Sequence, residues 1–187
     1  WLCAKILNAY GLPVAQCDIA QFGSQKALIV ERFDRQLHSS GKYWLRLVQE
    51  DICQATATPS STKYERDGGP DALDVARILK GSVNRDKDLE CLLKAQILYW
   101  MLAATDGHAK NFSLFHLPGG RYRATPLYDI LSAHPVIGHG AGHHPVTCIS
   151  QPHQVASNVA SRPAERCTAS VHARPCHCAW DWTRPGG

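Results

Sequence analysis

Four side chains able to do chemistry crowd one short stretch of the chain, ATDGHAKNFSLF, residues 104–115. They are an acid, an imidazole, an ammonium and an amide, contributed by Asp106, His108, Lys110 and Asn111. A surface loop accounts for about half of such polar clusters between apolar segments. The alternative is a site in which Asp106 takes a proton from a substrate hydroxyl while nearby oxygen atoms hold a metal ion.

The spacing of the acids and the amide matches that of phosphoryl-transfer enzymes. Protein kinases place an Asp and an Asn five positions apart in their catalytic loop, followed by a short hairpin and an Asp that holds magnesium. Here Asp106 and Asn111 have that spacing, a hairpin is predicted over 112–127, and Asp129 comes next. Asn111 and Asp129 would supply the hard oxygen ligands that Mg²⁺ prefers.

Each of these residues also has a plainer interpretation. Asp106 alone fits a helix-terminal turn, Asn111 a strand-edge cap, and Asp129 the cap of a following helix. His108 and Lys110 could place positive charge or donors near the phosphoryl oxygens, although a solvated Lys is the ordinary case. The joint pattern favours a site.

The clearest element is the predicted helix over 86–105, which delivers the cluster at its C-terminal end. Its apolar residues recur at i, i+3 and i+4 spacing: Leu89, Leu92, Leu93, Ile97, Trp100, Met101 and Ala104. We therefore expect a core helix, with Gly107 letting the backbone leave it abruptly. After the cluster, 112–117 and 121–128 predict two strands joined by Pro-Gly-Gly.

Further elements are predicted upstream by periodicity and turn residues. In chain order they are a helix over 1–11, a hairpin of strands 13–22 and 26–33, a strand from 44 that turns helical around Gln49, a loop over 59–70, and a helix over 72–80 capped by Asp71 and ended by Gly81.

Length and composition indicate one folded domain, or one domain with an appendage, in a chain of 187 residues of which 44% are hydrophobic and 19% charged. The net charge of +4 forms no basic stripe, so charge gives no case for nucleic-acid binding. The longest apolar run, 97–104, is too short to span a bilayer.

No Met precedes Trp1, and we expect the chain to be cut at its N-terminus. Four cysteines lie far apart in the sequence, and we expect them to be reduced thiols: Cys3, Cys17, Cys53 and Cys91.

The composition changes near residue 134. From there the chain has no Lys, Leu, Phe, Tyr or Met and becomes rich in His, Cys and Pro. A metal site is one interpretation, with the ligands His172, Cys176, His177 and Cys178, although their spacing does not match ordinary zinc sites. A disordered tail and an out-of-frame translation are the others, and we expect this segment to carry no function.

Five longer stretches resemble the HipA family of serine/threonine kinase toxins from bacterial toxin–antitoxin pairs. These are VERFDR, QEDICQA, PSSTKYERDGGP, ATDGHAKNFS and TPLYDILSA. The resemblance covers about residues 1–137, a HipA-like kinase C-terminal domain truncated at both ends, and leaves 138–187 as an irregular tail. It implies an α+β, protein-kinase-like fold: a mostly helical C-terminal lobe with short β-hairpins.

The resemblance also implies roles for individual residues. Asp106 matches the catalytic proton acceptor. The family's loop that contacts nucleotide and metal matches His108, Ala109, Lys110 and Asn111. Its second metal-side contact matches Tyr128 and Asp129. The hinge of its adenine pocket matches Glu31, Arg32 and Phe33. Without the resemblance, strand-end packing would explain the hinge residues. Glu50 and Asp51 read as helix N-terminal acids with no catalytic role.

The cofactors implied by the family are ATP and Mg²⁺. The implied partners are a HipB-like antitoxin and a protein substrate such as an aminoacyl-tRNA synthetase, with DNA reached only through the antitoxin, no membrane and a cytoplasmic location. Nothing in the sequence matches the family's phosphate-binding loop, its phosphate lysine or its regulatory serine, which would precede Trp1. Two hypotheses remain: a protein kinase, or a catalytically dead remnant or antitoxin-binding module.

Overall fold

The computed structural model describes residues 1–136. Its helices and strands are, in chain order, α1 Leu2–Ala9, β1 Cys17–Phe22, β2 Gln25–Val30, β3 Arg35–Leu37, β4 Trp44–Arg46, β5 Gln49–Asp51, α2 Ile52–Ala55, the 3₁₀ turns η1 Ser60–Thr62 and η2 Glu65–Asp67, α3 Ala72–Leu79, α4 Arg85–Met101, the 3₁₀ turn η3 Ala109–Asn111, β6 Ser113–Leu117 and β7 Arg121–Ala124. The predicted tail, with the zinc interpretation of His172, Cys176, His177 and Cys178, lies outside the described residues.

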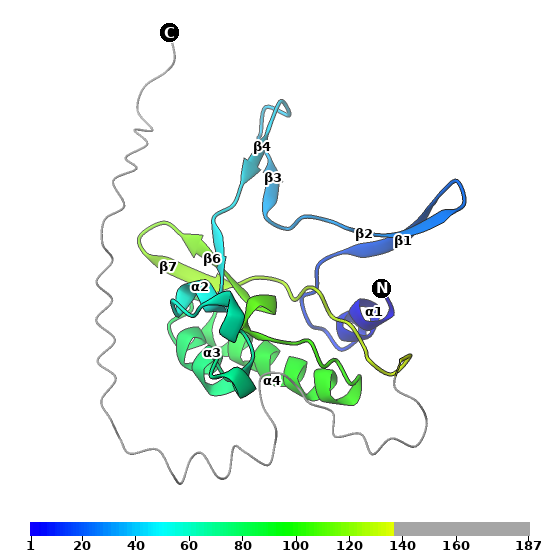
Figure 1. Cartoon of the computed structure of the whole chain (residues 1–187). Coiled ribbons are helices and arrows are strands. Elements are labelled where there is room, and N and C mark those ends of the chain that lie inside the picture. The colour runs from blue at the N-terminus through cyan, green and yellow to red at the C-terminus, as the bar shows by residue number, and fades with distance from the viewer. Residues whose placement is uncertain (137–187) are drawn as a thin grey trace, which may run out of the picture.

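A three-stranded antiparallel sheet, in the order β5-β6-β7, lies beside α2, α3 and α4 (Figure 1). β6 is the central strand, and its first residue, Ser113, pairs with Asp51 at the end of β5. The turn between β6 and β7 contains Gly119 and Gly120, both with positive φ, which glycine adopts without the strain that a Cβ would bring. The predicted hairpin is confirmed, and it follows directly on the polar loop.

The predicted core helix is confirmed as α4, but the predicted core face is only partly right. The buried residues of α4 are Leu92, Ala95, Leu98 and Tyr99. Other apolar side chains of the same helix face solvent: Leu93, Ile97, Trp100 and Met101. Because α4 is apolar on more than one side, spacing alone could not tell which side packs on the core.

Two other hairpins project from the helical body (Figure 1). The β1–β2 hairpin confirms the predicted pair of strands, and every residue of β2 is exposed. The shorter β3–β4 hairpin follows it. The chain just before β1 is tied to the body, since Ala15 N donates to the carbonyl of Leu127 at 2.8 Å. Strands make up nearly as much of residues 1–136 as α-helices do, so a mostly helical lobe is not confirmed.

The segment around Gln49 differs from its prediction. It forms strand β5 instead of helix, and the helix begins three residues later at Ile52. Pairing with β6 holds Gln49 extended, a tertiary contact that overrides local preference. Asp51 is the N-cap of α2 and forms a capping box with Gln54, as an acid at a helix start does.

The predicted cap of the next helix is confirmed. The carboxylate of Asp71 accepts a hydrogen bond from the backbone N–H of Asp74, in a second capping box that starts α3. The stretch from 59 to 70 is a loop as predicted, tightened by η1 and η2. Among the helices of residues 1–136, none has the length and apolar character needed to cross a bilayer.

Candidate active site

The end of α4 sets the position of the polar loop. Ala103 takes a left-handed conformation, φ 48°, and the N–H of Ala104 donates to the carbonyl of Tyr99 at 2.8 Å. Gly107 therefore is not the residue that turns the backbone. Position 107 favours glycine because its backbone lies against the buried Tyr99 ring: a Cβ there would lie 2.7 Å from Cδ2 of that ring. The core side of α4 and the polar loop are packed directly on each other.

Asp106 and Asn111 are brought together by a hydrogen bond within the loop. The side-chain Nδ2 of Asn111 donates to the backbone carbonyl of Asp106 at 2.7 Å, and Asn111 is only 4% exposed. This bond closes the loop and fixes the amide, so that the amide oxygen is the atom left to act as a ligand. The carboxylate of Asp106 remains half exposed, at 49%. An accessible acid thus lies beside an oriented amide.

The carboxylate of Asp106 has two neighbours. The phenol of Tyr64 donates to Oδ1 at 2.9 Å, and Nε2 of His108 lies 3.7 Å from the same oxygen. Sequence reasoning missed Tyr64, which lies in the PSSTKYERDGGP loop, 42 positions earlier. Burial chiefly lowers the pKa of His108, helped by the charge of Lys63 and opposed by Asp106. His108 is therefore neutral at pH 7.

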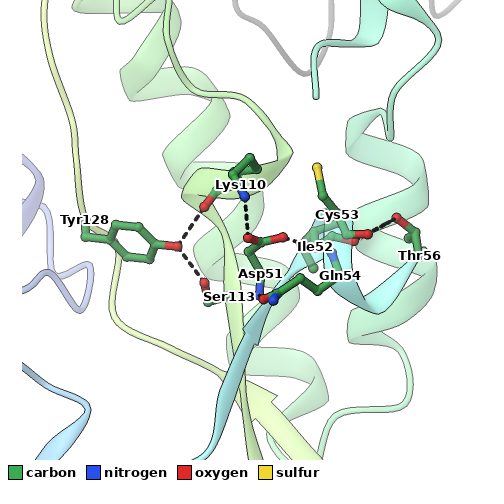
Figure 2. Close-up of polar contacts among 8 residues, drawn as sticks. All are labelled: Asp51, Ile52, Cys53, Gln54, Thr56, Lys110, Ser113 and Tyr128. Atoms are coloured by element: carbon green, nitrogen blue, oxygen red, sulfur yellow. Dashed lines mark hydrogen bonds and ion pairs between the residues drawn. The ribbon is translucent and has the colours of Figure 1, made fainter. Parts of the chain in front are cut away.

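Lys110 is held by an acid from another element. Its ammonium lies 2.9 Å from Oδ2 of Asp51, while Oδ1 of Asp51 accepts the N–H of Gln54 (Figure 2). The hydrogen bond with Asp51 is the main cause that raises the pKa of Lys110. The sequence assigned Asp51 no catalytic role; in the structure it anchors the loop. We expected the positive charge of Lys110 near phosphoryl oxygens, and in the structure it pairs with the carboxylate of Asp51.

Tyr128 joins the loop to the sheet. Its hydroxyl donates to the carbonyl of Lys110 at 2.8 Å and lies 2.5 Å from Oγ of Ser113 (Figure 2). Burial is the chief cause that raises the pKa of Tyr128. The ring centroid of Phe33 lies 5.6 Å from that of Tyr128 and 5.8 Å from that of Phe115. Phe33 is thereby placed against the residue that supports the polar loop.

The other two residues of the predicted hinge have different partners. Glu31 and Arg32 are exposed; the N–H of Glu31 donates to the carbonyl of Gln16, and Arg32 pairs with Asp34. Asp34 is buried between Arg32 and Arg35, and hydrogen bonding from Arg32 is the main cause that lowers its pKa to about 2. Of the hinge stretch, Phe33 alone touches the described site through its ring.

Asp129 lies in an unusual backbone conformation, with φ 56°, and its side chain is exposed. No helix follows it within residues 1–136, so it does not cap one there. The negative charge of Asp129 acts to raise the pKa of His108 and the pKa of Tyr128. Asp129 therefore acts within electrostatic range of the polar loop.

Asn111 and Asp129 carry oxygen donors of the kind that Mg²⁺ takes. Asn111 offers one buried, oriented amide oxygen and Asp129 one exposed carboxylate. Mg²⁺ commonly takes one or two protein oxygens and completes its shell with waters and phosphate oxygens. Residues 1–136 contain no cluster of three or more His, Cys, Asp or Glu side chains that could form an all-protein metal cage, and this type of site requires none.

Comparison with solved structures defines the fold as kinase-like. HipA of Shewanella oneidensis, solved with HipB and its operator DNA, superposes with a TM-score of 0.63 at 32% identity, over 71% of this chain and 33% of that one. The Helicobacter pylori kinase CtkA superposes with a TM-score of 0.50 at 13% identity, over 69% of this chain and 44% of that one. The second similarity is one of fold alone.

Residues 1–176 match the family model of the HipA-like C-terminal domain, and the chain belongs to that family. The serine/threonine-protein kinase toxin HipA of S. oneidensis is 38% identical over 144 residues, 71% of this chain and 33% of that protein. Y4mE of Sinorhizobium fredii is 37% identical over 129 residues, 68% of this chain and 30% of that protein. The predicted resemblance is confirmed, and the chain spans about a third of the length of these relatives.

Proposed function

We propose that this chain is the catalytic-loop part of a serine/threonine protein kinase of the HipA type. It would transfer the γ-phosphoryl group of ATP to a protein hydroxyl. The observation that carries the proposal is the closed loop of Asp106 and Asn111, with an accessible carboxylate and a buried, oriented amide. Family membership and the kinase names of relatives support it.

In this mechanism Asp106 accepts the proton of the acceptor hydroxyl. The hydroxyl oxygen bonds to the γ-phosphorus, while the bond from that phosphorus to the β–γ bridging oxygen breaks and ADP leaves. Asn111 and Asp129 would hold Mg²⁺, which when bound would neutralise charge on the phosphates. His108, being neutral, would act as a hydrogen-bond partner instead of a cation.

The remaining site residues would support the nucleotide. Phe33 would line the adenine pocket. Glu31 and Arg32 would supply backbone groups of the hinge other than the N–H of Glu31, which already donates to the carbonyl of Gln16. Lys110, paired with Asp51, would hold the loop in place, with Ala109 as part of its backbone. Tyr128 supports the same loop from the sheet side.

The partners are proposed from relatives. A HipB-like antitoxin is supported by the S. oneidensis HipA structure, which contains HipB and operator DNA. DNA would then be reached through the antitoxin. An aminoacyl-tRNA synthetase is the substrate class that we propose to test first, and the cytoplasm is the compartment in which such a substrate occurs.

Calorimetry of ATP binding in the presence of Mg²⁺ tests the proposal. We expect binding by the chain, loss of that binding in Asp129→Ala, and no change in Asp86→Ala, whose exposed side chain pairs with its neighbour Arg85. Phosphate transfer from labelled ATP to a synthetase should then disappear in Asp106→Asn. Absence of ATP binding in every variant would instead support an antitoxin-binding module, tested by capture of a HipB-like protein.

A further inference from the structure

The loop of residues 59–70 packs onto the catalytic loop at a point that the mechanism above leaves unused. The N–H of Ala109 donates to the carbonyl of Lys63 at 3.4 Å, and the phenol of Tyr64 donates to Oδ1 of Asp106 at 2.9 Å. The Tyr64 ring also meets His108 edge to face, with centroids 5.1 Å apart. One tyrosine thus touches both the proposed base and its buried neighbour.

Tyr64 is fixed in place by its own loop. The N–H of Gly69 donates to the carbonyl of Tyr64 at 2.9 Å, and a Cβ on Gly69 would lie 2.1 Å from the backbone oxygen of Thr62. Two cations lie over the ring, Lys63 Nζ at 4.9 Å and the Arg66 guanidinium at 5.1 Å from its centroid. The phenol is therefore presented to Asp106 in one orientation.

The contact leaves half of the carboxylate available. Tyr64 and His108 both lie on Oδ1 of Asp106, and His108 at 3.7 Å is too distant for a normal hydrogen bond. The contacts within residues 1–136 thus leave Oδ2 as the oxygen that can meet an acceptor hydroxyl. A carboxylate whose rotation is stopped in this way is preorganised for proton transfer.

We propose that Tyr64 is a positioning residue of the phosphoryl-transfer site, which holds Oδ1 of Asp106 so that Oδ2 faces the acceptor hydroxyl. The proposal rests on the proposed kinase function. During transfer the acceptor proton would move to Oδ2 as the oxygen–phosphorus bond forms and the bond from the γ-phosphorus to the bridging oxygen of ADP breaks. The Tyr64 phenol would keep its own proton. The hydrogen bond to Asp106 is the chief cause that raises the pKa of Tyr64, which suits a group that stays protonated.

The first test separates positioning from binding. Tyr64→Phe removes the hydroxyl and keeps the ring, and we expect kcat to fall about tenfold, the equivalent of one ordinary hydrogen bond, with KM for ATP unchanged. Tyr10→Phe, in an exposed residue at the end of α1, is the matched control and should match the unsubstituted protein. Unchanged kcat in Tyr64→Phe would overturn the proposal, and so would a faster rate, which would mean that the contact inhibits.

The second test does not depend on activity. In protein labelled with ¹³C at tyrosine Cζ, the Tyr64 signal, assigned from its loss in Tyr64→Phe, reports the phenol's titration. Asp106→Asn should lower the pKa of Tyr64, because the hydrogen bond to the carboxylate is the main cause of its rise. Asp129→Asn should leave that titration unchanged. If the unsubstituted protein transfers no phosphate, the proposed function fails, and this titration still decides the contact: an unchanged pKa in Asp106→Asn would overturn it.

Discussion

The ammonium of Lys110 lies 2.9 Å from the carboxylate of Asp51, a residue 59 positions earlier in the chain. The same carboxylate caps α2 through the N–H of Gln54. One acid therefore stabilises a helix start and anchors the loop that carries Asp106. This double use explains why the QED stretch matters to the site although neither acid in it touches the proposed reaction.

Asp51→Ala should lower the free energy of unfolding by about 2 kcal/mol, the sum of a lost helix cap and a part-exposed ion pair. Asp51→Asn keeps a good capping side chain and loses only the charge, so its cost should stay below about 1 kcal/mol. Urea unfolding of both variants measures the difference. Equal costs would show that the cap contributes nothing beyond the ion pair.

Gly107→Ala should be destabilising by about 1–3 kcal/mol, because its methyl group would overlap the Tyr99 ring in a packed core. Tyr99→Leu removes that ring, so adding Gly107→Ala to it should cost much less than Gly107→Ala alone. Thermal unfolding of the unsubstituted protein, the two single variants and the double variant completes a double-mutant cycle, which measures the coupling between positions 107 and 99. Additive costs would mean that the ring is not what excludes the methyl group.

The stability of the protein should fall as pH decreases from about 6.5, the ordinary pKa of histidine. Burial lowers the pKa of His108 in the folded protein, so below that pH the unfolded chain binds a proton more readily than the folded one. His108→Leu should flatten this part of the stability curve. Urea midpoints between pH 7.5 and 5 measure it; identical slopes for His108→Leu and the unsubstituted protein would refute the assignment.

Exposed apolar side chains on α4 should make the chain poorly soluble. The apolar face of α4, defined by Leu93, Ile97, Trp100 and Met101, is solvent-exposed within residues 1–136. Ile97→Lys should reduce self-association in sedimentation experiments while changing the free energy of unfolding by less than about 0.5 kcal/mol. Ala95→Lys, on the buried face, should prevent folding. A monodisperse unsubstituted chain with a sharp cooperative melt would contradict the expectation.

Much of the local structure could be predicted because its causes are local. Pro-Gly-Gly specifies the β6–β7 turn, and Asp71 starts α3. Asp106 and Asn111 are hydrogen-bonded within one loop, as their spacing suggests, while the phosphoryl-transfer role of that loop stays a prediction. The position of Asp129 after the hairpin completed the pattern, and its metal-binding role stays a prediction.

The parts that could not be predicted depend on contacts between distant segments. Tyr64 reaches Asp106 across 42 positions, and no local rule brings those two loops together. The strand at Gln49 exists because β6 pairs with it, and the buried side of α4 is chosen by the elements that cover it. The role of Gly107 likewise depends on the Tyr99 ring, which spacing alone does not place.

The central position of β6 has a consequence for how the site assembles. Its first residues follow the polar loop, and its partner β5 ends at Asp51, so the contact of Lys110 with Asp51 forms only when two segments far apart in sequence have paired. Contacts of such separation close a large loop and form slowly compared with helices or hairpins. Since one residue of slippage between β5 and β6 would move Asp51 by about 3.4 Å, a mispaired sheet would leave Lys110 without its acid. During synthesis the polar loop would therefore reach its final arrangement late, once β6 has paired with β5.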